Sequence, residues 1–197
     1  MILYFDTETT GLRPGNICQL SYILQTKESA VAKNMFFAVG YVEPSAAAVH
    51  GFTPEILYEL SGGRTFEDRF EEIAADFAAA NVLVAHNFAF DFMFMRAEYE
   101  RLGERFFYKD SFCTMKKFTP VCRIPRADGK SYKYPKLSEL CECFDIYPYD
   151  VSRASLSLFG AAPAAHDARY DTAALLLAVE EGMRRVADIK ECLSCAK

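Results

Sequence analysis

The chain has 197 residues, a formal net charge of −5 and 51% apolar residues. This length suits a single domain, and the composition excludes an intrinsically disordered chain. The acidic total excludes a histone-like protein that coats nucleic acid with its whole surface, but it permits an enzyme whose acids hold metal ions. No apolar run reaches the roughly 20 residues that cross a bilayer, and no signal-peptide pattern is present. Seven cysteines without framework spacing predict reduced thiols and a cytoplasmic location.

Strand-like runs dominate the first part of the chain, at residues 2–6, 17–25 and 35–42. The first run is apolar on both faces, which is typical of a central strand covered on both sides of a sheet. Apolar side chains at helical spacing predict an amphipathic helix over residues 65–80. A short buried strand is expected directly after it, at residues 81–85.

The second half of the chain alternates helical and irregular segments. We expect helices at residues 88–102, 137–144 and 168–186, a strand at 106–114, and mainly irregular backbone at 116–136 and 152–165. Asn87 is the expected N-cap of the first of these helices. Strands mixed with helices in this way predict an α/β fold, a sheet flanked by helices.

Two acids, Asp6 and Glu8, stand at the end of the first predicted strand. Since side chains alternate along a strand, both carboxylates leave it on the same side. Ligands of α/β proteins bind beyond the carboxyl ends of the strands. Carboxylates that project together repel each other unless a cation lies between them, and hard oxygen ligands favour Mg²⁺ or Mn²⁺. A solvated strand end remains an alternative for this pair taken alone.

Two further segments carry acids near predicted helix starts. Asp91 lies among apolar residues, where an unpaired acid is costly, although a capping carboxylate would also explain it. Asp171 shares a face with the apolar stripe of the last helix. His166 can join it only from outside that helix, because five helical residues separate side chains by about 140°. Asp167 as N-cap would place His166 there; a plain loop histidine is the alternative.

Three segments together carry a family resemblance: FDTETTGL at residues 5–12, HNFAFD at 86–91 and HDARYD at 166–171. In this order they resemble the three motifs of the DnaQ-like DEDDh 3′–5′ exonucleases, which include the epsilon-type proofreading subunits of bacterial DNA polymerase III. The sister DEDDy branch has a tyrosine four residues before the last aspartate, and Asp167 holds that position here. VHGFTPE at residues 49–55 also resembles a segment of the proofreading subunits.

The resemblance implies a fold and a set of site residues. The implied fold is RNase H-like, a five-stranded mixed sheet flanked by helices, with the exonuclease domain at residues 1–187 and a C-terminal tail at 188–197. The implied ligands of two Mg²⁺ or Mn²⁺ ions are Asp6, Glu8, Asp91 and Asp171, and the implied general base is His166. The implied contacts to the 3′-terminal nucleotide are Thr7, Thr9, Leu12, His50 and Phe90. Ser45 replaces the family's glutamate five residues before His50, so a surface-turn histidine stays open there.

The resemblance also implies an activity. We expect a metal-dependent 3′–5′ exonuclease that releases nucleoside 5′-monophosphates from single-stranded DNA, with a DNA polymerase as a candidate partner and no membrane. An RNA-trimming enzyme resembling RNase T or oligoribonuclease, and a non-catalytic nucleic-acid- or polymerase-binding module, remain open. Residues 116–136 hold seven basic side chains, one acid and two tyrosines, which predicts a strand-binding segment or, alternatively, a solvated basic loop. Cys192 and Cys195 form an isolated CxxC pair, interpreted as free thiols.

Overall fold

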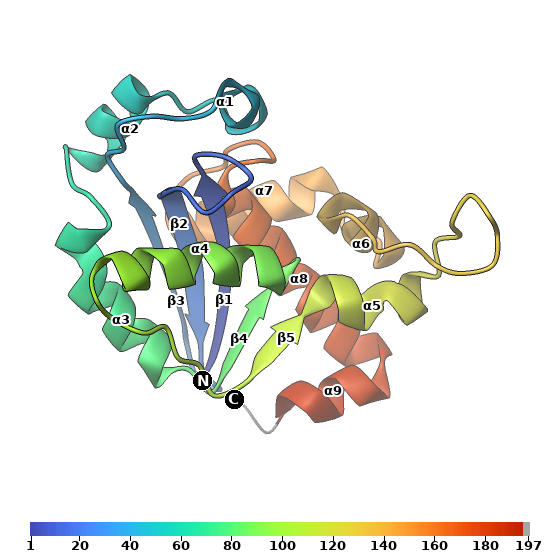
Figure 1. Cartoon of the computed structure of the whole chain (residues 1–197). Coiled ribbons are helices and arrows are strands. Elements are labelled where there is room, and N and C mark those ends of the chain that lie inside the picture. Colours follow the sequence, from blue (N-terminus) through green and yellow to red (C-terminus); the bar gives the residue numbers. More distant parts are fainter. Residues whose placement is uncertain (195–197) are drawn as a thin grey trace.

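The computed structural model describes residues 1–194, and its centre is a mixed sheet of five strands (Figure 1). The strands are β1 (Ile2–Thr9), β2 (Ile17–Gln25), β3 (Ala30–Phe36), β4 (Val82–Ala85) and β5 (Ser111–Cys113), in the spatial order β3-β2-β1-β4-β5. β1 pairs antiparallel with β2 and parallel with β4. β1 is therefore the central strand, as its apolar sequence predicts.

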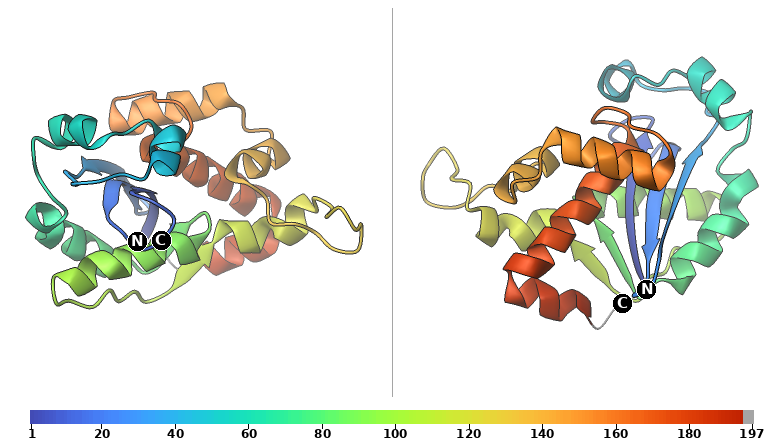
Figure 2. Two further views of the ribbon diagram at one scale, coloured as in Figure 1. Left: turned by 45° about the horizontal axis from the view of Figure 1, so that its top comes forward. Right: turned by 180° about the vertical axis from the view of Figure 1, so that it is seen from behind.

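The strict alternation of side chains along β1 divides the core between the two faces of the sheet. Ile2 and Tyr4 belong to the core on one face, and Leu3 and Phe5 to the core on the other. Helix α8 (Ala168–Arg185), with α6 (Leu137–Cys143) and α7 (Pro148–Phe159), covers the first face, and α3 (Phe70–Ala79) and α4 (Phe88–Arg101) cover the second (Figure 2). This layering confirms the predicted sheet flanked by helices.

Three segments differ from the sequence-based expectation. β3 spans Ala30–Phe36 rather than residues 35–42, because the turn closed by the Thr26 N–H donating to the Ser29 carbonyl (2.9 Å) starts its pairing with β2 early. β3 is a partly exposed edge strand and lacks an alternating apolar pattern. Residues 37–42 are not a strand, and the chain continues into helices α1 (Pro44–His50) and α2 (Pro54–Ser61), which no periodicity indicated.

Two segments expected to be irregular contain helices. α5 (Thr114–Cys122) forms where irregular backbone was predicted, because its buried Phe118 packs edge-on against Phe144 at 5.2 Å between ring centroids. α7 takes most of the second such segment and ends at Gly160, whose left-handed φ of 69° suits a residue without a side chain. Only residues 123–136 keep the predicted irregular form between α5 and α6.

The last described helix is α9 (Ala187–Ser194), which packs back onto the core through Ile189 and Leu193. The boundary between an exonuclease domain and a tail at residue 187 stays a prediction. Cys192 is exposed, and Cys195 lies outside the described residues. Among the helices of residues 1–194, none combines the length and apolar character needed to cross a membrane.

Candidate active site

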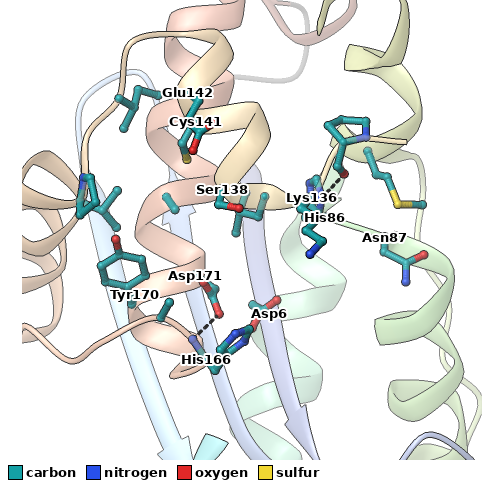
Figure 3. Close-up of a pocket in the computed structure, with 18 of the residues that line it drawn as sticks. Asp6, His86, Asn87, Lys136, Ser138, Cys141, Glu142, His166, Tyr170 and Asp171 are labelled. Atoms are coloured by element: carbon teal, nitrogen blue, oxygen red, sulfur yellow. Dashed lines mark hydrogen bonds between the residues drawn. The ribbon is translucent and has the colours of Figure 1, made fainter. Parts of the chain in front are cut away.

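Three acids meet at the carboxyl end of β1. Carboxylate oxygens of Asp6, Glu8 and Asp171 all lie within 4.8 Å of one another, and each side chain is partly buried. The two acids of β1 share one side of the strand. Asp171 comes from the first turn of α8, which packs against β1, and it lies beside Asp6 in Figure 3. The structure thus brings together three of the four acids predicted as metal ligands.

The fourth predicted ligand, Asp91, lies next to this group but is engaged with β1. It belongs to the first turn of α4 and is 2% exposed. Its Oδ1 accepts hydrogen bonds from the Thr7 N–H (3.1 Å) and the Thr7 hydroxyl (2.8 Å). Asp91 therefore ties α4 to the strand that carries Asp6 and Glu8. Asn87 occupies the predicted N-cap position, but it is left-handed and its side chain makes no capping hydrogen bond.

The acids are crowded at the end of β1. Burial, followed by the charges of Asp91 and Asp171, raises the pKa of Asp6 well above its ordinary value. Burial is also the main cause that raises the pKa of Glu8 to about 9, of Asp91 to about 7 and of Asp171 to about 6. Of the ion pairs formed by residues 1–194, none includes any of these four acids. Clustered hard oxygen donors of this kind fit divalent cations such as Mg²⁺ or Mn²⁺.

His166 stands at the edge of the acid cluster, just before α8. Its backbone has a left-handed φ of 66°, and its N–H donates to Asp171 Oδ2 at 3.1 Å. The imidazole is exposed and lies beside Asp6 and Asp171 in Figure 3. Asp167 is the N-cap of α8, with its side chain accepting the Arg169 N–H. This confirms the expectation that the cap places His166 outside the helix.

Gln19, which orients the start of α8, was not predicted as a site residue. Gln19 is fully buried in β2, its Nε2 donates to Asp167 Oδ1 (2.9 Å), and its Oε1 accepts the Ala168 N–H (3.1 Å). These two bonds fix the start of α8 against the sheet and so position both His166 and Asp171. The only signal in the sequence is a polar side chain in a mainly apolar strand. It indicates a buried, hydrogen-bonded group but does not identify the partner of that group.

The residues predicted to contact the nucleotide differ in their exposure and hydrogen bonding. The hydroxyls of Thr7 and Thr9 are buried and donate to Asp91 and to the Gly11 carbonyl, so these residues offer mainly backbone to a ligand. Leu12 is 78% exposed beyond the end of β1. The structure places the remaining two as follows: His50 Nε2 lies 3.2 Å from the Thr9 carbonyl oxygen with its ring stacked on Phe52, and Phe90 is half-buried against Phe94.

His50 and His166 flank the site from different elements. Burial, and to a smaller extent the nearby His166, lowers the pKa of His50. The hydrogen bond to the Thr9 carbonyl opposes this effect, and the role of His50 as a nucleotide contact stays a prediction.

The raised pKa values predict how the stability of the metal-free protein depends on pH. An acid whose pKa is higher in the folded than in the unfolded state makes the folded protein bind protons more tightly, so stability falls as pH rises through the folded-state values. Between pH 6 and pH 9 the pKa values of about 7 for Asp91 and about 9 for Glu8 govern this loss. A loss of about 2 kcal/mol would lower the melting temperature by about 4–8 °C for a domain of this size.

Thermal unfolding in EDTA across this pH range checks the prediction, and the same scan with saturating Mn²⁺ is the control. Cations bind the charged carboxylates, so the melting temperature should fall less steeply with pH when Mn²⁺ is present. A metal-free protein that becomes more stable from pH 6 to pH 9 would contradict the assigned directions.

Comparisons with known proteins agree with this geometry. A family model described as exonuclease, RNase_T, matches residues 3–179. A DNA polymerase III subunit epsilon-like protein of Rhodobacter capsulatus is 35% identical over 109 residues, which are 52% of this chain but 15% of that relative. The metal-free form of the E. coli ExoI–ssDNA complex superimposes with a TM-score of 0.70 over 98% of this chain and 42% of that one, at 16% identity. The structural likeness confirms the predicted fold.

Proposed function

Because this chain belongs to the exonuclease family, we propose that it hydrolyses single-stranded DNA stepwise from the 3′ end and releases nucleoside 5′-monophosphates. The observation that carries this proposal is the cluster of Asp6, Glu8 and Asp171 oxygens within 4.8 Å, beside His166. A binding module without turnover has no need for so many buried, mutually repelling acids at one point, whose pKa values are all raised.

The acids and the histidine have separate roles in this mechanism. Asp6, Glu8 and Asp171 would hold the divalent cations, and Asp91 would contribute directly or through water while it keeps β1 and α4 together. When bound, divalent cations such as Mg²⁺ or Mn²⁺ would supply the positive charge that stabilises the reaction at phosphorus. His166 removes the proton from the attacking water at its exposed imidazole.

Residues at the end of β1 and beyond it give the site its preference for the 3′ end of a nucleic-acid strand. Leu12 projects as an exposed apolar side chain that can pack on the last base, and the backbone of Thr7 and Thr9 with His50 faces the terminal sugar. Stacking of this kind does not depend on the base, which suits sequential removal. The epsilon-like relative supports a DNA polymerase as partner, and the cysteine content supports a cytoplasmic location.

Hydrolysis of 5′-labelled DNA and RNA oligonucleotides of the same sequence tests this function. In Mg²⁺ or Mn²⁺ the labelled DNA should shorten one nucleotide at a time, with nucleoside 5′-monophosphate as the product, and EDTA in excess should stop the reaction. Faster shortening of the RNA would instead identify an RNA-trimming enzyme. Cleavage that continues at full rate in EDTA would exclude the metal mechanism, and binding without cleavage in either metal would favour the non-catalytic module.

A further inference from the structure

A pocket of about 810 Å³ opens beside the acids. Asp6, His166 and Asp171 line one end of it, whereas none of the five residues proposed to hold the 3′-terminal nucleotide lines it. The pocket is therefore a separate space next to the acids, which the terminal nucleotide does not need. Pockets of about 300–1,000 Å³ enclose whole small ligands, so this one has room for a nucleotide.

Another part of the pocket wall is formed by Tyr134, Pro135 and Lys136, directly before α6. Figure 3 shows Lys136 next to His86. His86 holds this wall in place from the end of β4. Its Nε2 lies 3.0 Å from the Pro135 carbonyl oxygen, to which it donates, and its Nδ1 lies 2.9 Å from the Thr114 hydroxyl. Both ring nitrogens are thus engaged, and His86 is a positioning residue for this part of the wall.

Residues 123–136, here named the arm, include this wall and extend outward from it. The arm projects from the body of the protein between α5 and α6 (Figure 1). Its two limbs pair like a short hairpin, since the Arg126 N–H donates to the Ser131 carbonyl and the Lys133 N–H to the Ile124 carbonyl, both at 2.9 Å. The arm carries five basic side chains and one acid in a protein of net charge −5: Arg123, Arg126, Lys130, Lys133 and Lys136, with Asp128.

The pairing of these charges leaves the arm positive. Lys133 forms an ion pair with Glu139 of α6, which fixes the base of the arm rather than its tip. Arg126 and Lys130, nearer the tip, are exposed and are in no ion pair among the described residues. Tyr134, which belongs both to the arm and to the wall of the pocket, is 52% exposed.

We infer that the pocket and the arm bind the nucleotides on the 5′ side of the scissile phosphate. This inference rests on the proposed function: if the terminal nucleotide lies beyond β1 and the scissile phosphate at the acids, the rest of the strand leaves through the pocket. The ring of Tyr134 then stacks on an upstream base, and the cations of the arm contact the phosphates that follow. The bound partner is a single-stranded nucleic acid several nucleotides long.

Charge removal at the tip of the arm tests the phosphate contacts. The variant Arg126→Gln with Lys130→Gln should bind a long single-stranded DNA with cleavage-resistant phosphorothioate linkages about tenfold more weakly at about 0.1 M salt. The slope of log affinity against log salt should become shallower by about 1.4, since each phosphate contact to a single strand contributes about 0.7. Fluorescence anisotropy in Mg²⁺ measures both quantities.

The matched control is Lys27→Gln with Arg105→Gln, which removes the same two charge types from exposed positions. Lys27 lies in the turn after β2, at the end of the sheet opposite to the acids, because Gln25 pairs with Ile2. This control should retain the affinity and salt slope of the wild type. An arm variant whose affinity and slope equal those of the control would overturn the role of the arm.

Stacking at Tyr134 gives an independent readout. Tyr134→Ala should weaken binding of the long strand by about tenfold, whereas Tyr134→Phe, which keeps the ring, should bind like the wild type. The difference between Ala and Phe should shrink as the strand is shortened to a dinucleotide, since fewer upstream bases remain. Equal binding by the Ala and Phe variants at every length would refute the pocket assignment. Failure of the proposed function is a separate result, seen as metal-independent cleavage, or none, by the wild type.

Discussion

Replacing Asp171 with asparagine should lower the rate of DNA cleavage by about a thousandfold or more and, at the same time, stabilise the metal-free protein. Activity falls because Asp171 supplies one of the three clustered oxygens, and bound cations contribute several kcal/mol to the transition state, about 4 kcal/mol corresponding to 10³ in rate. Stability rises because burial raises the pKa of Asp171 to about 6, so its charged form costs free energy above that pH. Asparagine has a similar shape without the charge.

Two measurements separate this result from simple misfolding. The ratio kcat/KM in Mg²⁺ should fall, and the melting temperature in EDTA at about pH 8 should rise above that of the wild type. Glu28→Gln is the control, because Glu28 is an exposed acid in the turn between β2 and β3, far from the cluster. A variant that cleaves DNA normally in Mg²⁺, or that is less stable than the wild type in EDTA, would contradict the role of Asp171 as a buried metal ligand.

Elements with two-sided burial could be predicted from the sequence. β1 and β2 are buried along nearly their whole length because helices cover both faces of the sheet, and β2 was predicted at its observed bounds. Helix α8 was predicted within one residue, since its buried stripe repeats at helical spacing and Asp167 caps its start. In each case the residue pattern that predicts the element lies within the element itself.

Elements with little buried surface could not be predicted in this way. α7 buries only Val151 and Ser155 among its residues, and its three serines with Ala154 are more typical of a loop. β3 lies at the sheet edge, where partial exposure removes the alternation that marks a strand. The boundaries of both depend on neighbours elsewhere in the chain, β3 on its pairing with β2 and α7 on its packing against α8.

The same contrast between local and remote information applies to the candidate site. The motifs indicated the acids and His166 because each motif is local, and the structure brings Asp6, Glu8 and Asp171 together as expected. The contacts that position them are remote in sequence. Gln19 reaches Asp167 across 148 residues, and Thr7 reaches Asp91 across 84. Hydrogen bonds of this range follow from the packing of α4 and α8 on the sheet, which a single sequence does not specify.

His166→Ala should lower the cleavage rate by about 10²–10⁴-fold, the usual contribution of a positioned acid–base group, while DNA affinity changes little. The position of His166 supports this effect. The exposed imidazole lies beside Asp6 and Asp171, and the backbone is held there by the N–H bond to Asp171 at 3.1 Å (Figure 3). A left-handed backbone at a residue other than glycine costs about 1 kcal/mol or more and persists only where the surroundings impose it, which is typical of functional sites.

Single-turnover cleavage in Mg²⁺ measures the chemical step of this variant, and His166→Gln provides the matched control. Glutamine retains a polar side chain of similar length but cannot accept the proton from water at neutral pH, so both variants should be slow. Free imidazole should restore part of the rate of His166→Ala, because an exposed position leaves room for a small base from solution. The melting temperature in Mn²⁺ should stay close to that of the wild type. A His166→Ala protein with normal single-turnover rates would show that proton removal from the attacking water does not require this side chain.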